Sequence, residues 1–216
     1  VLERLERDGF SFSLDSDKRT LIRRARFDLI GLPPSPEDVD TFLADQHPDA
    51  WSRLLDRLLD SDHYGERWGR HWLEDRVRES AWKYRDYVIR SLSADKPLDQ
   101  FIREQLAGDE LVSRPYRNLS AADTDRLIAT GFLRNGPDGT GDRAVNQDIA
   151  RNEVVAETIN IVSSSLLGMS IGCARCHNHR FDPITHVDYH RMRAIFEPAY
   201  DWKNWRSTEE RRISLW

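Results

Sequence analysis

Apolar residues along this chain recur at helical spacing. The clearest run is Trp51, Leu54, Leu55, Leu58 and Leu59, which follows the i, i+3, i+4, i+7, i+8 spacing of an amphipathic helix. Similar spacing predicts further helices over residues 21–29, 39–43, 82–92, 97–106, 120–132, 147–167 and 186–196. No stretch alternates apolar and polar residues over the length of a convincing strand. The pattern therefore predicts a mainly α protein, an irregular bundle of about eight to ten helices joined by long loops.

Capping residues mark where several of these helices begin. Ser35, followed by Pro36 and two acidic residues, is a strong start signal with Ser35 as the N-cap. Asp15 or Ser16 is expected to cap the preceding helix, which ends before Gly31. The local sequence thus agrees with the helical periodicity.

The composition is that of a helix-rich globular protein. The chain has 216 residues, of which 39% are hydrophobic and 32% are charged, a balance that separates it from disordered proteins. The net charge of −5 argues against a nucleic-acid partner, which requires a basic face. No apolar run approaches the ~18 residues of a membrane span. We expect a single domain over residues 1–216 with no span in this chain.

Both cysteines of the chain lie in one short segment, Cys173-Ala174-Arg175-Cys176-His177. A C-x-x-C-H string is the attachment signature of c-type haem, in which two thiols bind the porphyrin and the next histidine binds iron. A zinc site is one alternative, with further ligands from His179, His186 or His190. A redox disulfide between the two cysteines is another. The motif favours covalent haem, which is attached outside the cytoplasm.

Other segments, taken together with this motif, carry a family resemblance. They are LIRR (21–24), FDLIGLPP (27–34), YGERW (64–68), RHWL (70–73), YRDYVI (84–89), QLAGD (105–109), ATGFL (129–133), GCARCHNHRFDPI (172–184) and DY (188–189). Over about residues 14–200 the chain resembles the planctomycete cytochrome-associated family, a domain of unknown function. The resemblance implies a c-type cytochrome role and a further C-terminal domain beyond Trp216. One departure is a shortened loop, or missing residues, between Val77 and Trp82.

Haem would bring several residues together. His177 is the proximal ligand, and Cys173 and Cys176 are the covalent anchors. His71 is the better candidate for the opposite side of the iron, because it lies in a family motif on a helical face with Trp68 and Trp72. Met169 and Met192 are weaker candidates, the first because it is close to the attachment turn. His179 is expected to fix the loop by hydrogen bonds or to contact a propionate rather than to bind iron, and Arg175, Arg180 and Trp205 are candidate neighbours of the ring or its propionates.

These residues support more than one function. The first is electron transfer to an unidentified redox partner protein, with six-coordinate haem c inside the helical bundle. The second is a haem enzyme with an open distal site, peroxidase-like or oxidising a carbohydrate-related substrate. The third is a zinc- or disulfide-stapled interaction domain without haem. We favour electron transfer, in the periplasm or otherwise outside the cytoplasm, and leave the question of enzymatic activity open.

Overall fold

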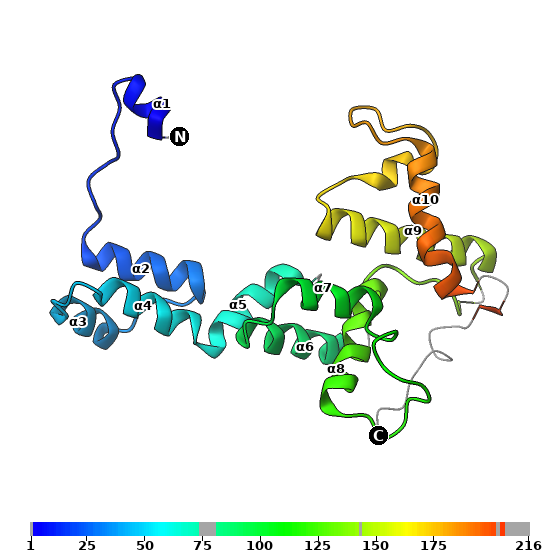
Figure 1. Ribbon diagram of the computed structural model, residues 1–216, viewed down its shortest axis with the longest axis horizontal. Helices are drawn as coiled ribbons and strands as arrows, with labels where there is room; N and C mark the ends of the chain where they lie inside the picture. The colour runs from blue at the N-terminus through cyan, green and yellow to red at the C-terminus, as the bar shows by residue number, and fades with distance from the viewer. Residues whose placement is uncertain (1, 74–80, 143, 202–203, 206–216) are drawn as a thin grey trace. The chain divides into compact units, whose positions relative to one another are not determined.

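The computed structural model describes residues 2–73, 81–142, 144–201 and 204–205 of the chain. These residues form ten α-helices and two short 3-10 helices, and no strand occurs among them (Figure 1). The prediction of a mainly α protein with about eight to ten helices is confirmed. The elements are α1 (Leu2–Arg7), α2 (Lys18–Leu29), α3 (Pro36–Ala44), α4 (Ala50–Leu59), α5 (Asp62–Trp72), α6 (Ala81–Ser93), α7 (Leu98–Ala107), α8 (Ala121–Ala129), η1 (Thr130–Arg134), α9 (Gln147–Leu166), η2 (Ile171–Arg175) and α10 (His186–Tyr200).

The chain divides into two compact units. The first comprises Val1–Leu73 and Val88–Lys96, and the second comprises Glu74–Tyr87 and Pro97–Trp216. The long helix α6 therefore contributes its C-terminal half to the first unit and its N-terminal half to the second. A single domain over residues 1–216 stays a prediction.

The first unit has its core between α2, α3 and α4. Buried residues come from all three helices and include Ile22, Phe42 and Leu54, which are 0%, 3% and 5% exposed. Ser35 caps α3 as predicted, and it forms a reciprocal capping box with Asp38. Apolar spacing sets the buried face of all three helices, and the Ser35 cap sets where α3 begins.

The N-cap of α2 corrects a prediction. The cap is Asp17, not Asp15 or Ser16. The Asp17 carboxylate accepts hydrogen bonds from the backbone N–H and the hydroxyl of Thr20, both at 2.9 Å. An N-cap side chain binds the amide two or three residues further on, and Asp17 stands directly before Lys18, the first residue of α2.

The first unit also contains α5, which packs against residues 88–93 of α6. A Cβ atom on Gly65 would collide with the Ser93 hydroxyl and the Ile89 carbonyl oxygen. A Cβ atom on Gly69 would lie 3.1 Å from the Ile89 side chain. Two glycines one turn apart thus give α5 a flat face that lets the helices approach closely.

The second unit begins with aromatic packing between α6 and α7. The rings of Tyr87 and Phe101 are stacked, with centroids 5.9 Å apart and an interplanar angle of 9°. The Tyr87 hydroxyl donates a hydrogen bond to the Glu104 carboxylate at 2.8 Å. Because Glu104 is only 3% exposed, this bond compensates part of the cost of its burial.

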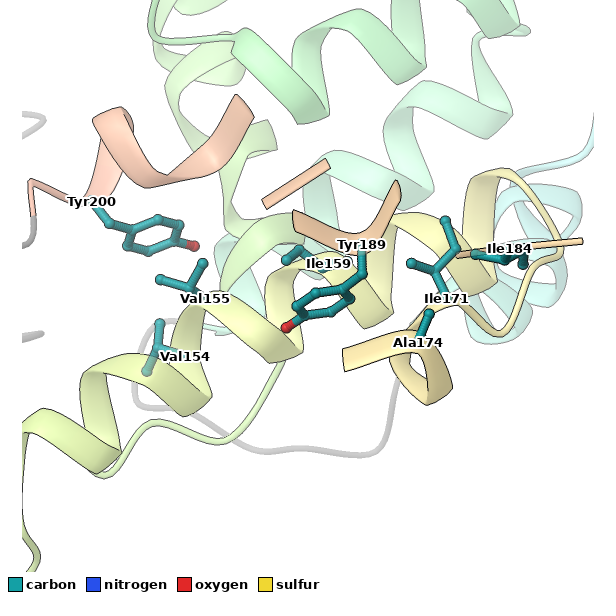
Figure 2. Packing of buried hydrophobic residues seen from close by; sticks show 8 residues of the cluster. All are labelled: Val154, Val155, Ile159, Ile171, Ala174, Ile184, Tyr189 and Tyr200. Atoms are coloured by element: carbon teal, nitrogen blue, oxygen red, sulfur yellow. The ribbon is translucent and has the colours of Figure 1, made fainter. Parts of the chain in front are cut away.

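The C-terminal part of the second unit is built on α9, η2 and α10. The prediction of a long helix leading to the cysteine segment is confirmed by α9, which is followed by Gly168 with a positive φ of 62°. Side chains from α9, η2, α10 and the preceding loop gather in one core (Figure 2). We call it the C-terminal core; its buried residues are Val154, Val155, Ile159, Ile171, Ala174, Ile184, Tyr189 and Tyr200.

No helix of the described residues is both long enough and apolar enough to cross a membrane.

Candidate functional site

The cysteine segment lies on η2 and is anchored by its apolar residues. Ile171 and Ala174 are 7% and 0% exposed and belong to the C-terminal core. They are three residues apart, so they share one face of the 3-10 turn. Cys173 and Cys176 are also three residues apart, and both are exposed free thiols. The turn therefore buries one pair of positions and presents the two thiols to solvent.

Gly172 allows this turn to lie close to α9. A Cβ atom at position 172 would collide with the side-chain oxygen of Asn160 on α9. Any larger residue would push the turn away from the helix or displace Asn160. Gly172 thus helps to set the position of both thiols.

A two-point ion pair links the same turn to α9. Arg175 Nη1 donates to Glu153 Oε2 at 2.9 Å, and Arg175 Nη2 donates to Glu153 Oε1 at 2.7 Å. The hydrogen bonds from Arg175 lower the pKa of the Glu153 carboxyl, and those to Glu153 raise the pKa of the Arg175 guanidinium. A bidentate pair fixes direction as well as distance, so it orients the turn on the helix.

His177 follows the second cysteine with an exposed side chain. Its Nδ1 is 2.8 Å from the backbone oxygen of Asn178. A carbonyl oxygen only accepts, so Nδ1 carries the hydrogen and Nε2 keeps its lone pair. This is the tautomer in which a histidine binds a metal through Nε2, with its other nitrogen held by a carbonyl group.

His179 holds the loop that follows. Its Nδ1 accepts hydrogen bonds from the backbone N–H groups of Asp182 at 2.8 Å and Phe181 at 3.3 Å. Its Nε2 is 3.2 Å from the Ser170 hydroxyl. A carboxylate oxygen of Asp182 also lies 3.3 Å from Nδ1, but the shorter backbone bond assigns the lone pair to that nitrogen. The prediction that His179 fixes the loop is confirmed.

Comparison with protein families identifies the chain. The model of a protein family of unknown function, DUF1549 (PSCyt2), matches residues 1–201. The chain belongs to this family. No curated protein and no solved structure matches the chain. The match confirms the resemblance seen in the sequence motifs, and the family description assigns no function.

Two of the residues predicted to act together belong to different units of this DUF1549 domain. His71 lies on α5 in the first unit, whereas His177 lies in the second. His71 is exposed, and its ring centroid is 5.6 Å from that of Trp68, as their shared helical face predicts. Its role as an iron ligand stays a prediction. The predicted shortened loop between Val77 and Trp82 lies largely outside the described residues.

Other predicted neighbours of the haem have partners of their own. Arg180 lies 5.6 Å from the ring centroid of Phe181, which is 85% exposed. Trp205 stacks on Tyr200 with centroids 5.5 Å apart. Met192 packs against the C-terminal core. Contacts of Arg175 or Arg180 with haem propionates stay predictions.

The site also contains a buried hydroxyl group that sequence reasoning missed. Tyr189 is 1% exposed, and its hydroxyl has no hydrogen-bond partner among the described residues. Smaller electrostatic effects of Tyr189 and Cys176 add to that of Glu153 in raising the pKa of Arg175. The sequence signal was the Asp188-Tyr189 motif, which carries no information about the position of the hydroxyl.

The two haem-free alternatives stay predictions. No group of three or more His, Cys, Asp or Glu side chains gathers there in a way that could hold a metal ion. A zinc staple normally needs four protein ligands. The two thiols are free rather than bonded to each other.

Proposed function

We propose that this DUF1549 domain binds haem c and transfers electrons, with Cys173 and Cys176 as attachment points and His177 as the proximal ligand. One observation carries the proposal. The two thiols are free and exposed on a turn anchored by Ala174, and the adjacent His177 keeps Nε2 available for a metal.

The donor set fits the group. Free thiols add to the vinyl groups of haem, and an imidazole is a common iron ligand. The Asn178 carbonyl oxygen accepts from His177 Nδ1 and so fixes the tautomer that ligation requires. When bound, the haem supplies an iron that gains and loses one electron.

The remaining residues of the site act by positioning. The pair between Arg175 and Glu153 and the close contact at Gly172 hold the turn on α9. His179 holds the following loop. A rigid attachment turn keeps the two thiols and the imidazole in one arrangement, and such preorganisation lowers the cost of binding.

The compartment and partner follow from this proposal. Thioether attachment takes place outside the cytoplasm, so we place the protein in the periplasm or an equivalent space. Electron transfer requires a redox partner protein, which would approach the exposed edge of the haem.

The test is spectroscopic. The chain is matured with the c-type haem apparatus, and its visible spectrum is recorded oxidised and reduced, with a pyridine haemochrome assay. We expect covalent haem with resolved α and β bands on reduction. A Cys173→Ser/Cys176→Ser variant should lose covalent haem, and His177→Ala should retain part of it with altered axial ligation. His63→Ala is the control, because His63 pairs with Glu66 at 2.9 Å on α5.

Each outcome has a definite meaning. Covalent haem in the double-serine variant, or a parent protein without haem, would contradict the proposal. A high-spin spectrum in the parent would replace electron transfer by the haem-enzyme alternative with an open distal position.

A further inference from the structure

A pair of histidines on α10 has a geometry that neither the cysteine motif nor the proposed function uses. His186 and His190 lie one helical turn apart, and their Nε2 atoms are 3.1 Å apart. The ring centroids are separated by 4.5 Å with an interplanar angle of 77°. Residues at i and i+4 share one face of a helix, so the two nitrogens lie close together on that face.

The distance between the two nitrogens matches that of ligands sharing one metal ion. At a metal–nitrogen distance of about 2.05 Å, two nitrogens are about 2.9 Å apart at a right angle and about 3.3 Å apart at the tetrahedral angle. The observed separation of 3.1 Å lies between these values. Ligation requires both rings in the tautomer with hydrogen on Nδ1, so that both Nε2 lone pairs are available.

The pair is held in place by the residues around it. The His186 backbone N–H donates to the side-chain oxygen of Asn178 at 2.9 Å. Tyr189, buried in the C-terminal core, fixes the face of α10 next to His190 with ring centroids 5.2 Å apart. The capping box of Thr185 and Asp188 fixes the start of the helix directly before His186. The helix therefore needs little reorganisation to present both rings.

Charges of both signs lie near the two histidines. The N-terminus of a helix carries a partial positive charge that disfavours a cation. The Asp188 carboxylate, in the same turn, opposes this effect. The described residues offer no third His, Cys, Asp or Glu to this pair, so water must complete the coordination.

We propose that His186 and His190 form a surface binding site for a divalent transition metal ion such as Zn²⁺. The two imidazole Nε2 atoms are the protein ligands, and the site is separate from the thiols of Cys173 and Cys176. With two protein ligands it is weaker than a structural four-ligand zinc site. It does not depend on haem.

The experiment is a Zn²⁺ titration by calorimetry on the full 216-residue chain, carrying Cys173→Ser and Cys176→Ser so that thiols cannot bind the ion. We expect one site. His186→Ala or His190→Ala should lower its affinity at least about tenfold, since even removing a partner of a metal ligand costs that much. His63→Ala, which changes an exposed histidine on α5, should leave the affinity unchanged.

A rescue variant separates ligation from folding. His190→Cys offers a thiolate, which also binds zinc, and should restore the affinity. With Co²⁺ as the probe, this variant should show thiolate-to-cobalt charge-transfer bands that the histidine pair lacks. Equal Zn²⁺ affinity in the two alanine variants and the parent would overturn the proposal, as would absence of these bands in His190→Cys. Neither result bears on haem attachment.

Discussion

Arg175 and Glu153 join the cysteine turn to α9 through two hydrogen bonds of 2.9 and 2.7 Å. The two residues are 22 positions apart in the sequence. No local pattern links them, and only the folded chain brings them together. The pair links η2 to α9, so its loss should loosen the turn that carries the two thiols.

Glu153→Gln removes the charge of this pair and keeps its shape. Because Glu153 and Arg175 side chains are 47% and 31% exposed, solvent screens the attraction, and we expect a loss of about 1 kcal/mol or less in the free energy of unfolding. That corresponds to a fall of about 2–4 °C in Tm for a chain of this size. Thermal unfolding followed by circular dichroism measures it.

Asp99→Asn is the matched control. Asp99 pairs with Arg103 at 3.3 Å on α7, and both side chains are largely exposed, at 73% and 64%. This pair should contribute nothing measurable. Equal Tm values for Glu153→Gln and the parent would show that the Arg175 pair does not hold the turn.

The Glu153 carboxyl should make the stability of the protein depend on pH. Hydrogen bonds from Arg175 lower the pKa of Glu153 below its ordinary value. A carboxyl whose pKa is lowered by folding stabilises the protein at pH values above its unfolded pKa. That contribution disappears as the pH falls through the lower folded pKa. At pH 7, urea unfolding should therefore give a larger free energy of unfolding for the parent than for Glu153→Gln. This difference should shrink as the pH is lowered through and below the unfolded pKa. A constant difference at every pH would refute this cause.

Two buried tyrosines should respond oppositely to loss of their hydroxyls. The Tyr189 hydroxyl has no partner among the described residues, whereas the Tyr200 hydroxyl lies 2.6 Å from the Thr158 hydroxyl. An unpaired buried hydroxyl costs free energy, and a paired one contributes about 1 kcal/mol. In haem-free protein, Tyr189→Phe should leave Tm unchanged or raise it, and Tyr200→Phe should lower it. A marked destabilisation by Tyr189→Phe would reveal a partner for that hydroxyl.

A pair of glycine substitutions tests the close approach of η2 to α9. Gly172→Ala places a methyl group against the Asn160 side-chain oxygen and should cost about 1–3 kcal/mol through overpacking. Gly139→Ala is the control, because its Cβ would lie 3.6 Å from that of Ala150, an ordinary contact. Urea midpoints of the two variants give the comparison. A stable Gly172→Ala protein would mean that Asn160 moves aside freely.

The sequence predicted local features well, and long-range ones poorly. The Ser35 cap, the length of α9 and the loop role of His179 rest on spacing along a few turns, which the chain determines by itself. The α2 cap was misplaced because Asp15, Ser16 and Asp17 all have capping side chains, and only the position of Thr20 decides between them.

The sequence motif predicted the cysteines and the histidine of the site. It did not predict the residues that hold them in place. Cys173, Cys176 and His177 stand next to one another in a recognisable string. Glu153 and the unpaired Tyr189 hydroxyl depend on how α9, η2 and α10 pack. Such contacts are set by tertiary structure, which residue spacing does not encode.

His71 is the predicted ligand of the iron opposite His177, because it lies in a family motif and shares a helical face with Trp68. His63 lies on the same helix and pairs with Glu66. In haem-loaded protein, His71→Ala should convert a low-spin spectrum to a high-spin one, because one strong-field nitrogen ligand is removed. His63→Ala should leave the spectrum unchanged. If the His71→Ala protein keeps its low-spin bands, another residue binds the iron. If the parent is already high-spin, the distal position is open, and the haem-enzyme alternative explains the site better than electron transfer.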